Sequence, residues 1–337
     1  MTWIGGSNQV ASLATLTTVR AGTMERKTDT KTYKLNHAMI RVKDPRSAIQ
    51  FYELLGLSVV QKLTFPENKF DLYFLGVDSP GSPSHGKFTF DRQGLIELTH
   101  NYGTESDDNY RVSNGNEKPY LGFSHISMSV ANVQSTYQTL AKAGYKFQQD
   151  VSSGNEPVIA LDPDGYWIRI TEKGPPNKST ASNPPGSFSV NQYALRVTDA
   201  TRSVRYYTEN LGMKLIKTLD SQNGNSKTFL LGYPSTGPFT GTEDMSRREG
   251  LLALIWQGGE NAISQVHNGN DQPQGFGHIC VTVDNIDAAC ARLEGLNVAW
   301  KKRLTDGKMK NVAFLLDPDN YWIELVQNEG FTGKANF

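Results

Sequence analysis

The stretch LDPDGYWIRI at residues 161–170 has a near-copy, LDPDNYWIEL, at residues 316–325. Each copy joins a turn signature, rich in Asp, Pro and Gly or Asn, to an apolar run typical of a β-strand. The two strands differ in charge at one matching place, where Arg169 stands in the first copy and Glu324 in the second. The pair predicts one fold made twice, with two sites of unlike chemistry.

The similarity between the two halves extends far beyond this stretch. Residues 37–56 realign with residues 192–212, and GFSHI at 122–126 realigns with GFGHI at 275–279. Self-similarity at a nearly fixed offset marks an internal duplication. We expect a first half at residues 35–172 and a second half at 191–328, joined by a Pro/Ser-rich linker at 173–190. A disordered or targeting tail at 1–34 should precede them, and a short tail at 329–337 should follow.

Each half divides once more. In the first half, the pattern predicts a strand near residue 37, a helix opened by Pro45, and three further strands at 58–65, 70–77 and 94–101. The segment from residue 122 to residue 170 repeats this order. We therefore predict an α+β protein of four βαβββ modules, which begin near residues 35, 122, 190 and 275. Each module should present a curved sheet, and paired modules should enclose a cavity.

Composition excludes several classes of partner. The 34 basic residues balance the 34 acidic ones, so the net charge gives no reason to expect nucleic acid. No apolar run approaches the ~20 residues that a membrane helix requires, and the two cysteines, Cys280 and Cys290, form no disulfide framework. We expect a soluble cytoplasmic protein. The Ser/Thr-rich lead before Glu25 faintly resembles a transit peptide, so a mitochondrial location is the alternative.

Polar residues on the predicted strands suggest a metal site. Side chains two residues apart share one face of a strand, which directs His37 and Glu97 of the first module, and His278 and Glu324 of the fourth, to comparable places. Two imidazoles and two carboxylates suit a borderline divalent ion. A lone strand histidine is more often structural, but four matching positions in a repeat are hard to obtain by accident. The remaining candidates, His85, His100 and His267, we predict to be non-ligands.

Several motifs carry a family resemblance: RVKDP, FYELLGL, KFDLYFLG, ELTHNYGTE, NGN before GFGHI, DGKMKNVAF and DPDNYWIEL. Together they resemble glyoxalase I of the vicinal oxygen chelate superfamily, in the fungal type that fuses two copies. The resemblance spans roughly residues 35–328. It implies that His37, Glu97, His278 and Glu324 form one metal site between modules one and four. It also implies a degenerate second site between modules two and three, with both carboxylates missing, at His125, Arg169, Gln192 and Ala253.

The resemblance also implies an activity, lactoylglutathione lyase, a carbon–sulfur lyase. The enzyme would isomerise the glutathione–methylglyoxal hemithioacetal to S-D-lactoylglutathione through a metal-bound enediolate, with Glu324 as the base and Glu97 serving the opposite face. One divalent ion is expected per chain, zinc first, with nickel or cobalt as alternatives, in a working monomer. Implied glutathione contacts are Arg41, Asn101, Lys302, Lys308 and Met309.

Three rival functions remain to be compared. A glutathione-dependent isomerase of another α-ketoaldehyde differs only in the aldehyde pocket, which the sequence marks least. A non-catalytic binding protein of the same superfamily would tolerate lost ligands, as the second site has lost them. An extradiol dioxygenase would use two histidines and one carboxylate and would need no fourth ligand or basic loop. The sequence leaves open which metal binds and whether the degenerate site holds a regulator.

Overall fold

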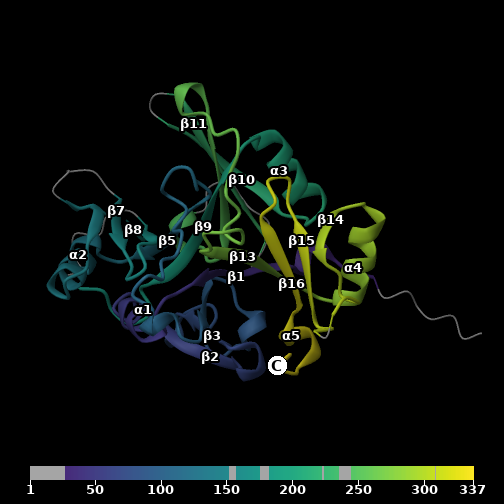
Figure 1. Ribbon diagram of the computed structural model, residues 1–337, viewed down its shortest axis with the longest axis horizontal. Coiled ribbons are helices and arrows are strands. Elements are labelled where there is room, and N and C mark those ends of the chain that lie inside the picture. Colours follow the sequence, from purple (N-terminus) through teal and green to yellow (C-terminus); the bar gives the residue numbers. More distant parts are fainter. Residues whose placement is uncertain (1–26, 152–156, 175–181, 222–223, 235–243, 308) are drawn as a thin grey trace, which may run out of the picture.

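Two mixed β-sheets of eight strands each, with helices packed against them, form the molecule (Figure 1). The computed structural model describes residues 27–151, 157–174, 182–221, 224–234, 244–307 and 309–337. The strand and helix order confirms the predicted α+β architecture of four βαβββ modules.

The bounds of the elements follow the four modules along the chain. The first module contains β1 (Lys34–Arg41), α1 (Pro45–Glu53), β2 (Ser58–Phe65), β3 (Phe70–Gly76) and β4 (Leu95–Asn101). The second contains β5 (Phe123–Val130), α2 (Val133–Lys142), β6 (Phe147–Gln149), β7 (Val158–Leu161) and β8 (Trp167–Glu172). The third contains β9 (Ser189–Val197), α3 (Ala200–Glu209), β10 (Lys214–Asp220), β11 (Ser226–Gly232) and β12 (Leu251–Gln257). The fourth contains β13 (Phe276–Val283), α4 (Ile286–Gly295), β14 (Ala299–Lys302), β15 (Val312–Leu316) and β16 (Trp322–Gln327), before a short α5 (Glu329–Thr332).

Each sheet takes one module from each half of the sequence. The strand order in one sheet is β14-β15-β16-β13-β1-β4-β3-β2, which joins modules four and one. The other sheet has the order β10-β11-β12-β9-β5-β8-β7-β6, which joins modules three and two. The joins are antiparallel pairs of first strands, β1 with β13 and β5 with β9. The two sequence halves are therefore interlocked through both sheets.

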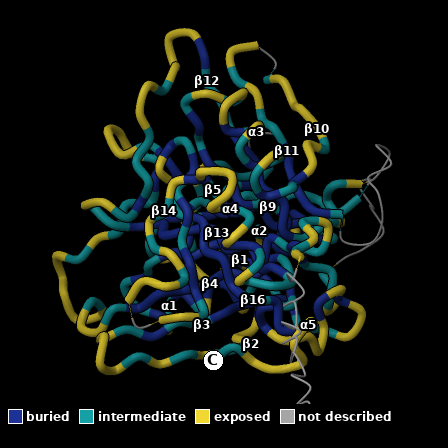
Figure 2. Tube along the Cα trace, turned by 90° about the vertical axis from the view of Figure 1, so that its right-hand side faces the viewer, coloured by how far each residue is buried: buried dark blue, intermediate teal, exposed yellow. Residues whose placement is uncertain are grey.

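The helices begin at side-chain caps in every module. The residue before each helix accepts a hydrogen bond from a backbone N–H of the first turn, and these caps are Asp44, Asn132, Asp199 and Asn285. A side-chain oxygen at this position satisfies a donor that the helix itself leaves unpaired. The apolar face of α1 buries Ala48 and Phe51 against its sheet. Figure 2 shows the buried chain gathered at the centre of the molecule, around β1, β13, β5 and β9.

The repeated LDPD stretch ties a turn to the helix of the preceding module. Asp162 accepts hydrogen bonds from the backbone N–H groups of Asp164 and Tyr166 at 3.0 and 2.9 Å. Its other oxygen accepts the Tyr52 hydroxyl of α1 at 3.0 Å. The second copy makes the same three bonds through Asp317, Asp319, Tyr321 and Tyr207. The Asp and Tyr residues that the two copies share thus build the fold, and the position that differs in charge, Arg169 or Glu324, points to chemistry.

The terminal segments, as far as they are described, pack on the sheet of modules one and four. Thr28 and the backbone of Asp29 donate to the carboxylate of Asp284 at 2.5 and 2.8 Å. Glu329 of α5 accepts the backbone N–H groups of Phe90 and Asn336. Residues 1–26 of the predicted tail and 175–181 of the predicted linker lie outside the described chain. None of the described helices has the length and apolar character that crossing a lipid bilayer requires.

Candidate metal centre

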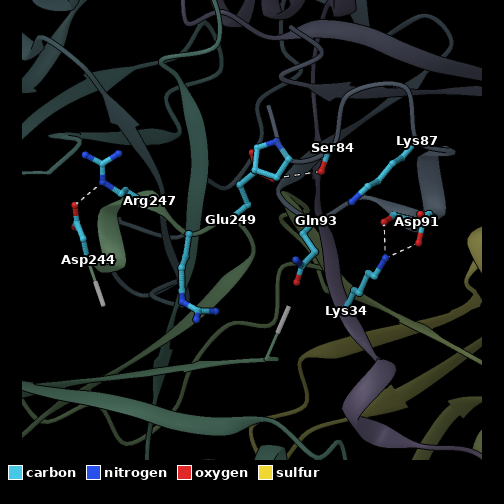
Figure 3. A pocket seen from close by; sticks show the side chains of 10 residues that line it. Lys34, Ser84, Lys87, Asp91, Gln93, Asp244, Arg247 and Glu249 are labelled. Carbon is cyan, nitrogen blue, oxygen red and sulfur yellow. Dashed lines mark hydrogen bonds and ion pairs between the residues drawn. The ribbon is translucent and has the colours of Figure 1, made fainter. Parts of the chain in front are cut away.

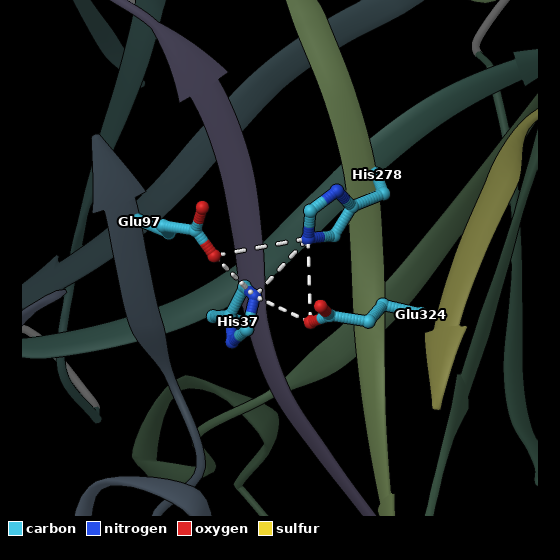
Figure 4. A group of neighbouring side chains, drawn as sticks. All are labelled: His37, Glu97, His278 and Glu324. Atoms are coloured by element: carbon cyan, nitrogen blue, oxygen red, sulfur yellow. Dashed lines mark hydrogen bonds and ion pairs between the residues drawn. The ribbon is translucent and has the colours of Figure 1, made fainter. Parts of the chain in front are cut away.

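Four side chains from four adjacent strands converge on one point (Figure 4). The Nε2 atom of His37 lies 2.9 Å from Glu97 Oε2, 3.3 Å from Glu324 Oε2 and 3.3 Å from His278 Nε2. All four donor atoms lie within 4.8 Å of one another. In the described part of the chain this is the one group of three or more His, Cys, Asp or Glu residues that could hold a metal ion. We refer to it as the His/Glu quartet.

Strand register explains how distant residues reach this point. β1 lies between β4 and β13, and β16 lies beyond β13, so the four ligand strands are neighbours in one sheet. Met39 pairs with Glu97 across β1 and β4, and Cys280 pairs with Glu324 across β13 and β16. These pairings place the side chains on one face within reach of each other. The predicted site between modules one and four is confirmed.

Asn36 fixes the tautomer of His37. Its Nδ2 group donates to the carbonyls of Thr89 and Arg92 at 2.9 and 2.7 Å, so its Oδ1 atom faces His37 as an acceptor. His37 Nδ1 lies 2.7 Å from that oxygen and must carry the proton. In the neutral imidazole, Nε2 then presents a lone pair to the centre of the quartet. Such an outer bond orients a metal-binding imidazole and sets its tautomer. Asn36 was not among the predicted site residues, although an Asn stands before the first-strand position in both halves, as Asn36 and Asn191.

Burial makes the quartet strongly attractive to a cation. The exposed fractions are 0 % for His37, 3 % for Glu97, 5 % for His278 and 9 % for Glu324. Burial alone would lower the pKa of His37, but hydrogen bonds to the two carboxylates outweigh it and raise that pKa to about 9. Burial likewise opposes the charge of Glu324, yet the two imidazoles hold the pKa of its carboxyl well below the usual range. Glu324 Oε2 lies 3.3 Å from His37 Nε2 and 3.4 Å from His278 Nε2.

The donor set fits a divalent metal ion. Two imidazole nitrogens that face each other, with two buried carboxylate oxygens, leave lone pairs and negative charge converging on one point. Two nitrogen and two oxygen donors match the preferences of zinc and its neighbours among the transition metals. An aromatic wall surrounds the donors, with the rings of Phe74 and Phe314 5.3 and 5.4 Å from those of His37 and His278. This wall restricts the orientation of both imidazoles.

Comparison with known proteins identifies the family. The model for the Glyoxalase/Bleomycin resistance protein/Dioxygenase superfamily matches residues 34–170 and again residues 189–325. Lactoylglutathione lyase from Schizosaccharomyces pombe is 42% identical over 309 residues, which cover 90% of this chain and 99% of that protein. The chain belongs to the glyoxalase I family of lactoylglutathione lyases.

Other members of the glyoxalase I family match in whole or in part. Glyoxalase I from Saccharomyces cerevisiae is 37% identical over 316 residues, covering 90% of this chain and 95% of that protein. A lactoylglutathione lyase from Pseudomonas aeruginosa is 39% identical over 156 residues, which cover 44% of this chain and 88% of that protein. The crystal structure of glyoxalase I from Zea mays superimposes with a TM-score of 0.65 at 23% identity, covering 89% of this chain and 94% of that one, and so shares the fold.

In the other sheet, the positions that correspond to the quartet also lie together, but none of them carries a carboxylate. Ser127 pairs with both Gln192 and Arg169, so β9, β5 and β8 bring these positions together with His125 as in the first sheet. Burial, and then the positive charge of Arg169, lower the pKa of His125 to about 3. Ala253 is buried at the place that Glu97 takes in the first sheet. These positions do not make a cation site.

Arg41, one of the implied glutathione contacts, holds the junction between modules one and four. Its guanidinium donates to the carbonyls of Gly275 and Phe276 at 3.2 and 3.3 Å and to Asn270 Oδ1 at 2.9 Å. Arg196 makes the corresponding bonds in the other sheet, to Gly122, Phe123 and Asn116. The same bonds thus occur where no cation site exists. Arg41 serves the fold, and its contact with glutathione stays a prediction.

The other implied glutathione contacts lie around the basic loop at residues 301–310. Lys302 Nζ donates to the carbonyls of Met309 and Val312 at 2.7 and 2.6 Å, which closes the loop on itself. Met309 is exposed, and Asn101 is half-buried at the end of β4. Lys308 lies outside the described residues. The three histidines predicted to be non-ligands lie outside the quartet, with His85 beside Asp78 and His100 beside Glu105.

A separate cavity of about 640 Å3 lies away from the quartet, between loops of modules one and three (Figure 3). Its lining includes Ser84 and Lys87 from the first module and Glu249 from the third. Burial raises the pKa of Glu249 to about 7, and its carboxylate accepts the Ser84 hydroxyl at 3.3 Å. None of the quartet residues lines this cavity, so its size does not identify the site of chemistry.

Proposed function

We propose that the His/Glu quartet isomerises the hemithioacetal of glutathione and methylglyoxal to S-D-lactoylglutathione. The observation that carries this proposal is the convergence of four buried donor atoms, from modules one and four, in a chain of the glyoxalase I family. The residues would hold one divalent ion per chain, with zinc as the first candidate and nickel or cobalt as alternatives. A bound ion would supply positive charge that stabilises the negative charge developing on two neighbouring substrate oxygens.

The two carboxylates of the quartet have different freedom to move a proton. Glu97 is held from two sides, because Thr99 donates to its Oε1 at 3.2 Å and His37 Nε2 lies 2.9 Å from its Oε2. Glu324 is the more exposed of the two, and its Oε2 lies farther from His37 Nε2, at 3.3 Å. We assign Glu324 as the base that takes the proton from one carbon and returns it to the next, a role worth ~10²–10⁴ in rate. Glu97 serves the opposite face of the substrate.

The basic loop offers the charges that the tripeptide requires. Glutathione carries two carboxylates, and ammonium and guanidinium groups bind carboxylates through short charged hydrogen bonds. Lys302 of this loop is half-exposed. With Arg41, Asn101, Lys308 and Met309, it is a proposed glutathione contact.

The interlocked sheets support a working monomer. A complete quartet needs one module from each half, and this chain supplies both. We infer that no second copy is required and that the protein acts in the cytoplasm. Light scattering should return the mass of one chain, and an obligate dimer would contradict the inference.

Metal analysis combined with a spectrophotometric assay of hemithioacetal isomerisation tests the proposed activity. Glu324→Gln should reduce kcat at least ~10²-fold at near-normal folding, since it removes a ligand and the proposed base while keeping the shape. Glu209→Gln, a matched change at an exposed pair on α3, is the control and should keep full turnover. Equal losses in the two variants would contradict the assignment. Methylglyoxal and a bulkier α-ketoaldehyde should be compared, because the aldehyde pocket decides between the two isomerases considered above.

A further inference from the structure

A buried carboxylate outside the quartet holds the loop that supports the metal centre. Glu329, the first residue of α5, is 1 % exposed. One of its oxygens accepts the backbone N–H of Phe90 at 2.9 Å, and the other accepts the backbone N–H of Asn336 at 2.6 Å. A buried carboxylate is costly unless hydrogen bonds satisfy it, and bonds to an ionised acceptor are stronger than neutral ones. The carboxylate thus fastens a short loop to the segment that follows β16.

The bond to Phe90 fixes the direction of a carbonyl as well as that of an N–H group. Phe90 is the middle residue of the short 3-10 helix Thr89–Asp91. Its N–H and the carbonyl of Thr89 belong to one peptide group, which is planar and rigid. When Glu329 holds the N–H end of this plane, the carbonyl at the other end is held as well. A charged acceptor on the N–H also polarises the peptide group and strengthens its carbonyl as an acceptor.

The Thr89 carbonyl leads directly to a ligand of the quartet. The Nδ2 group of Asn36 donates to this carbonyl at 2.9 Å, and the Oδ1 atom of Asn36 lies 2.7 Å from His37 Nδ1. Two planar groups, the Thr89–Phe90 peptide and the Asn36 amide, therefore join Glu329 to His37 through hydrogen bonds in series. The side chains of Glu329, Asn36 and His37 are all buried, so solvent does not compete for these bonds.

The second sheet holds the corresponding loop through a different bond. The repeat places Gly174 at the position of Glu329 and Ser246 at that of Phe90. There the Ser246 hydroxyl accepts the backbone N–H of Gly174 at 2.7 Å, and Asn191 donates to carbonyls of the loop. A hydroxyl is thus enough to join this loop to the segment after the last strand. The sheet that carries the quartet has a carboxylate at this place, which points to a role at the metal centre.

We propose that Glu329 is a positioning residue for the metal ligand His37 and acts through the Thr89–Phe90 peptide group and Asn36. The inference rests on the proposed metal centre. Glu329 is not a member of the quartet and contributes no donor atom to it. Without the bond from Phe90 to Glu329, the Thr89 carbonyl is free to turn away from Asn36, and the amide then holds the imidazole less firmly.

Competition with a chelating dye on the full chain, with zinc as the probe, tests the proposal. Glu329→Gln keeps the shape but offers one acceptor oxygen to two N–H groups. It should lower zinc affinity about three- to tenfold, less than the ~10–100-fold for a direct partner of a ligand, because Asn36 keeps its bond to the Arg92 carbonyl. In an Asn36→Ala background, Glu329→Gln should have no further effect, since the series is already broken. Ser246→Ala breaks the corresponding bond of the other sheet and should bind zinc as the parent protein does.

Two outcomes would overturn the proposal while leaving the metal centre in place. These are equal zinc affinities in the parent and Glu329→Gln, and a fall in affinity that is as large without Asn36 as with it. A parent protein that binds no divalent ion would overturn this inference together with the proposed metal centre, whereas binding of zinc without isomerisation of the hemithioacetal would contradict the proposed function alone. Circular dichroism shows whether each variant is folded. If Glu329→Gln is not, Glu329→Asp provides the same comparison, because it keeps the charge but is too short to reach both N–H groups.

Discussion

At the residue scale, the two sheets differ in chemistry because different side chains stand at the same position of the repeated strand. Glu324 and Arg169 occupy matching places on the last strands of modules four and two. Glu324 completes a set of four donors that could hold a metal ion, and Arg169 places a guanidinium at the corresponding position of the other sheet. The surrounding Asp and Tyr residues, which are identical in the two copies, bind the turn and the neighbouring helix. Chemistry therefore changes by substitution at a few strand positions while the fold is untouched.

Asn36 allows a residue-scale test of how the metal site is held. Asn36→Ala should lower metal affinity ~10–100-fold, because His37 loses the bond that sets its tautomer. Asn191→Ala is a matched control, since Asn191 Nδ2 bonds the carbonyls of Met245 and Arg248 just as Asn36 bonds its own loop. Both variants should lose similar stability, as measured by urea denaturation. If competition with a chelating dye shows equal metal affinity in both, Asn36 has no role in positioning His37.

Sequence patterns predicted the four residues of the quartet but not the structural roles of Asn36 and Arg41 beside it. The two-residue period of strands and the repeat offset were enough to select His37, Glu97, His278 and Glu324. The role of Arg41 in the fold could not be predicted, because its partners near residue 275 become neighbours only when β1 pairs with β13. The repeat could have drawn attention to Asn36, since Asn191 stands at the same place in the second half. Its role in orienting His37 could not be predicted, because it depends on carbonyl groups of a distant loop.

At the scale of elements, the LDPD turns act as clamps between a hairpin and a helix. The Tyr52 hydroxyl on α1 and the Tyr207 hydroxyl on α3 each donate to a buried Asp of the following module, at 3.0 and 2.9 Å. The clamp is present in both halves, although only one sheet carries the quartet. Its purpose is therefore to set the position of the helix, which packs against the later strands of its own module.

Removal of one clamp hydroxyl should cost stability without touching chemistry. Tyr52→Phe should lower the free energy of unfolding by about 1–3 kcal/mol, because a buried Asp oxygen loses its partner. Tyr207→Phe should cost a similar amount, since its bonds are the same. Urea denaturation followed by circular dichroism measures both, and kcat should stay at the parent value. A cost confined to one of the two variants would show that the clamps are not equivalent.

At the scale of the whole molecule, the loops of modules one and three meet around the cavity of Figure 3, where Glu249 is half-buried. Because the folded pKa of Glu249 is raised to about 7 from an ordinary 4.5, its protonated form is favoured by folding. That stabilising contribution is fully present below about pH 4.5 and is lost as the pH rises through about 7. Glu249→Gln should therefore show a smaller loss of stability between pH 5 and pH 8 than the parent. Identical urea midpoints against pH in the two proteins would contradict this.

Repair of the second site tests what a working site needs beyond its ligands. Arg169→Glu with Ala253→Glu should let a second divalent ion bind beside His125 and Gln192, seen as two ions per chain by elemental analysis. In a Glu324→Gln background, turnover should nevertheless stay near the silenced level. The second sheet has SSGNE where the first has DGKMK, so the substrate would not be positioned over the ion. Recovery of substantial turnover would mean that ligands alone limit the second site.

Each sheet combines one module from each half of the chain, and this arrangement lets the two sites differ from one another in sequence. In an enzyme assembled from two identical chains, each substitution appears at both symmetry-related sites, so a change that ruins one ruins the other. Here each sheet draws its strands from different stretches of one polypeptide. Arg169 and Ala253 could therefore arise in one sheet while His37, Glu97, His278 and Glu324 stayed intact in the other. One polypeptide that carries both copies can thus lose metal binding in one sheet and keep it in the other, while the same Asp–Tyr bonds hold both scaffolds.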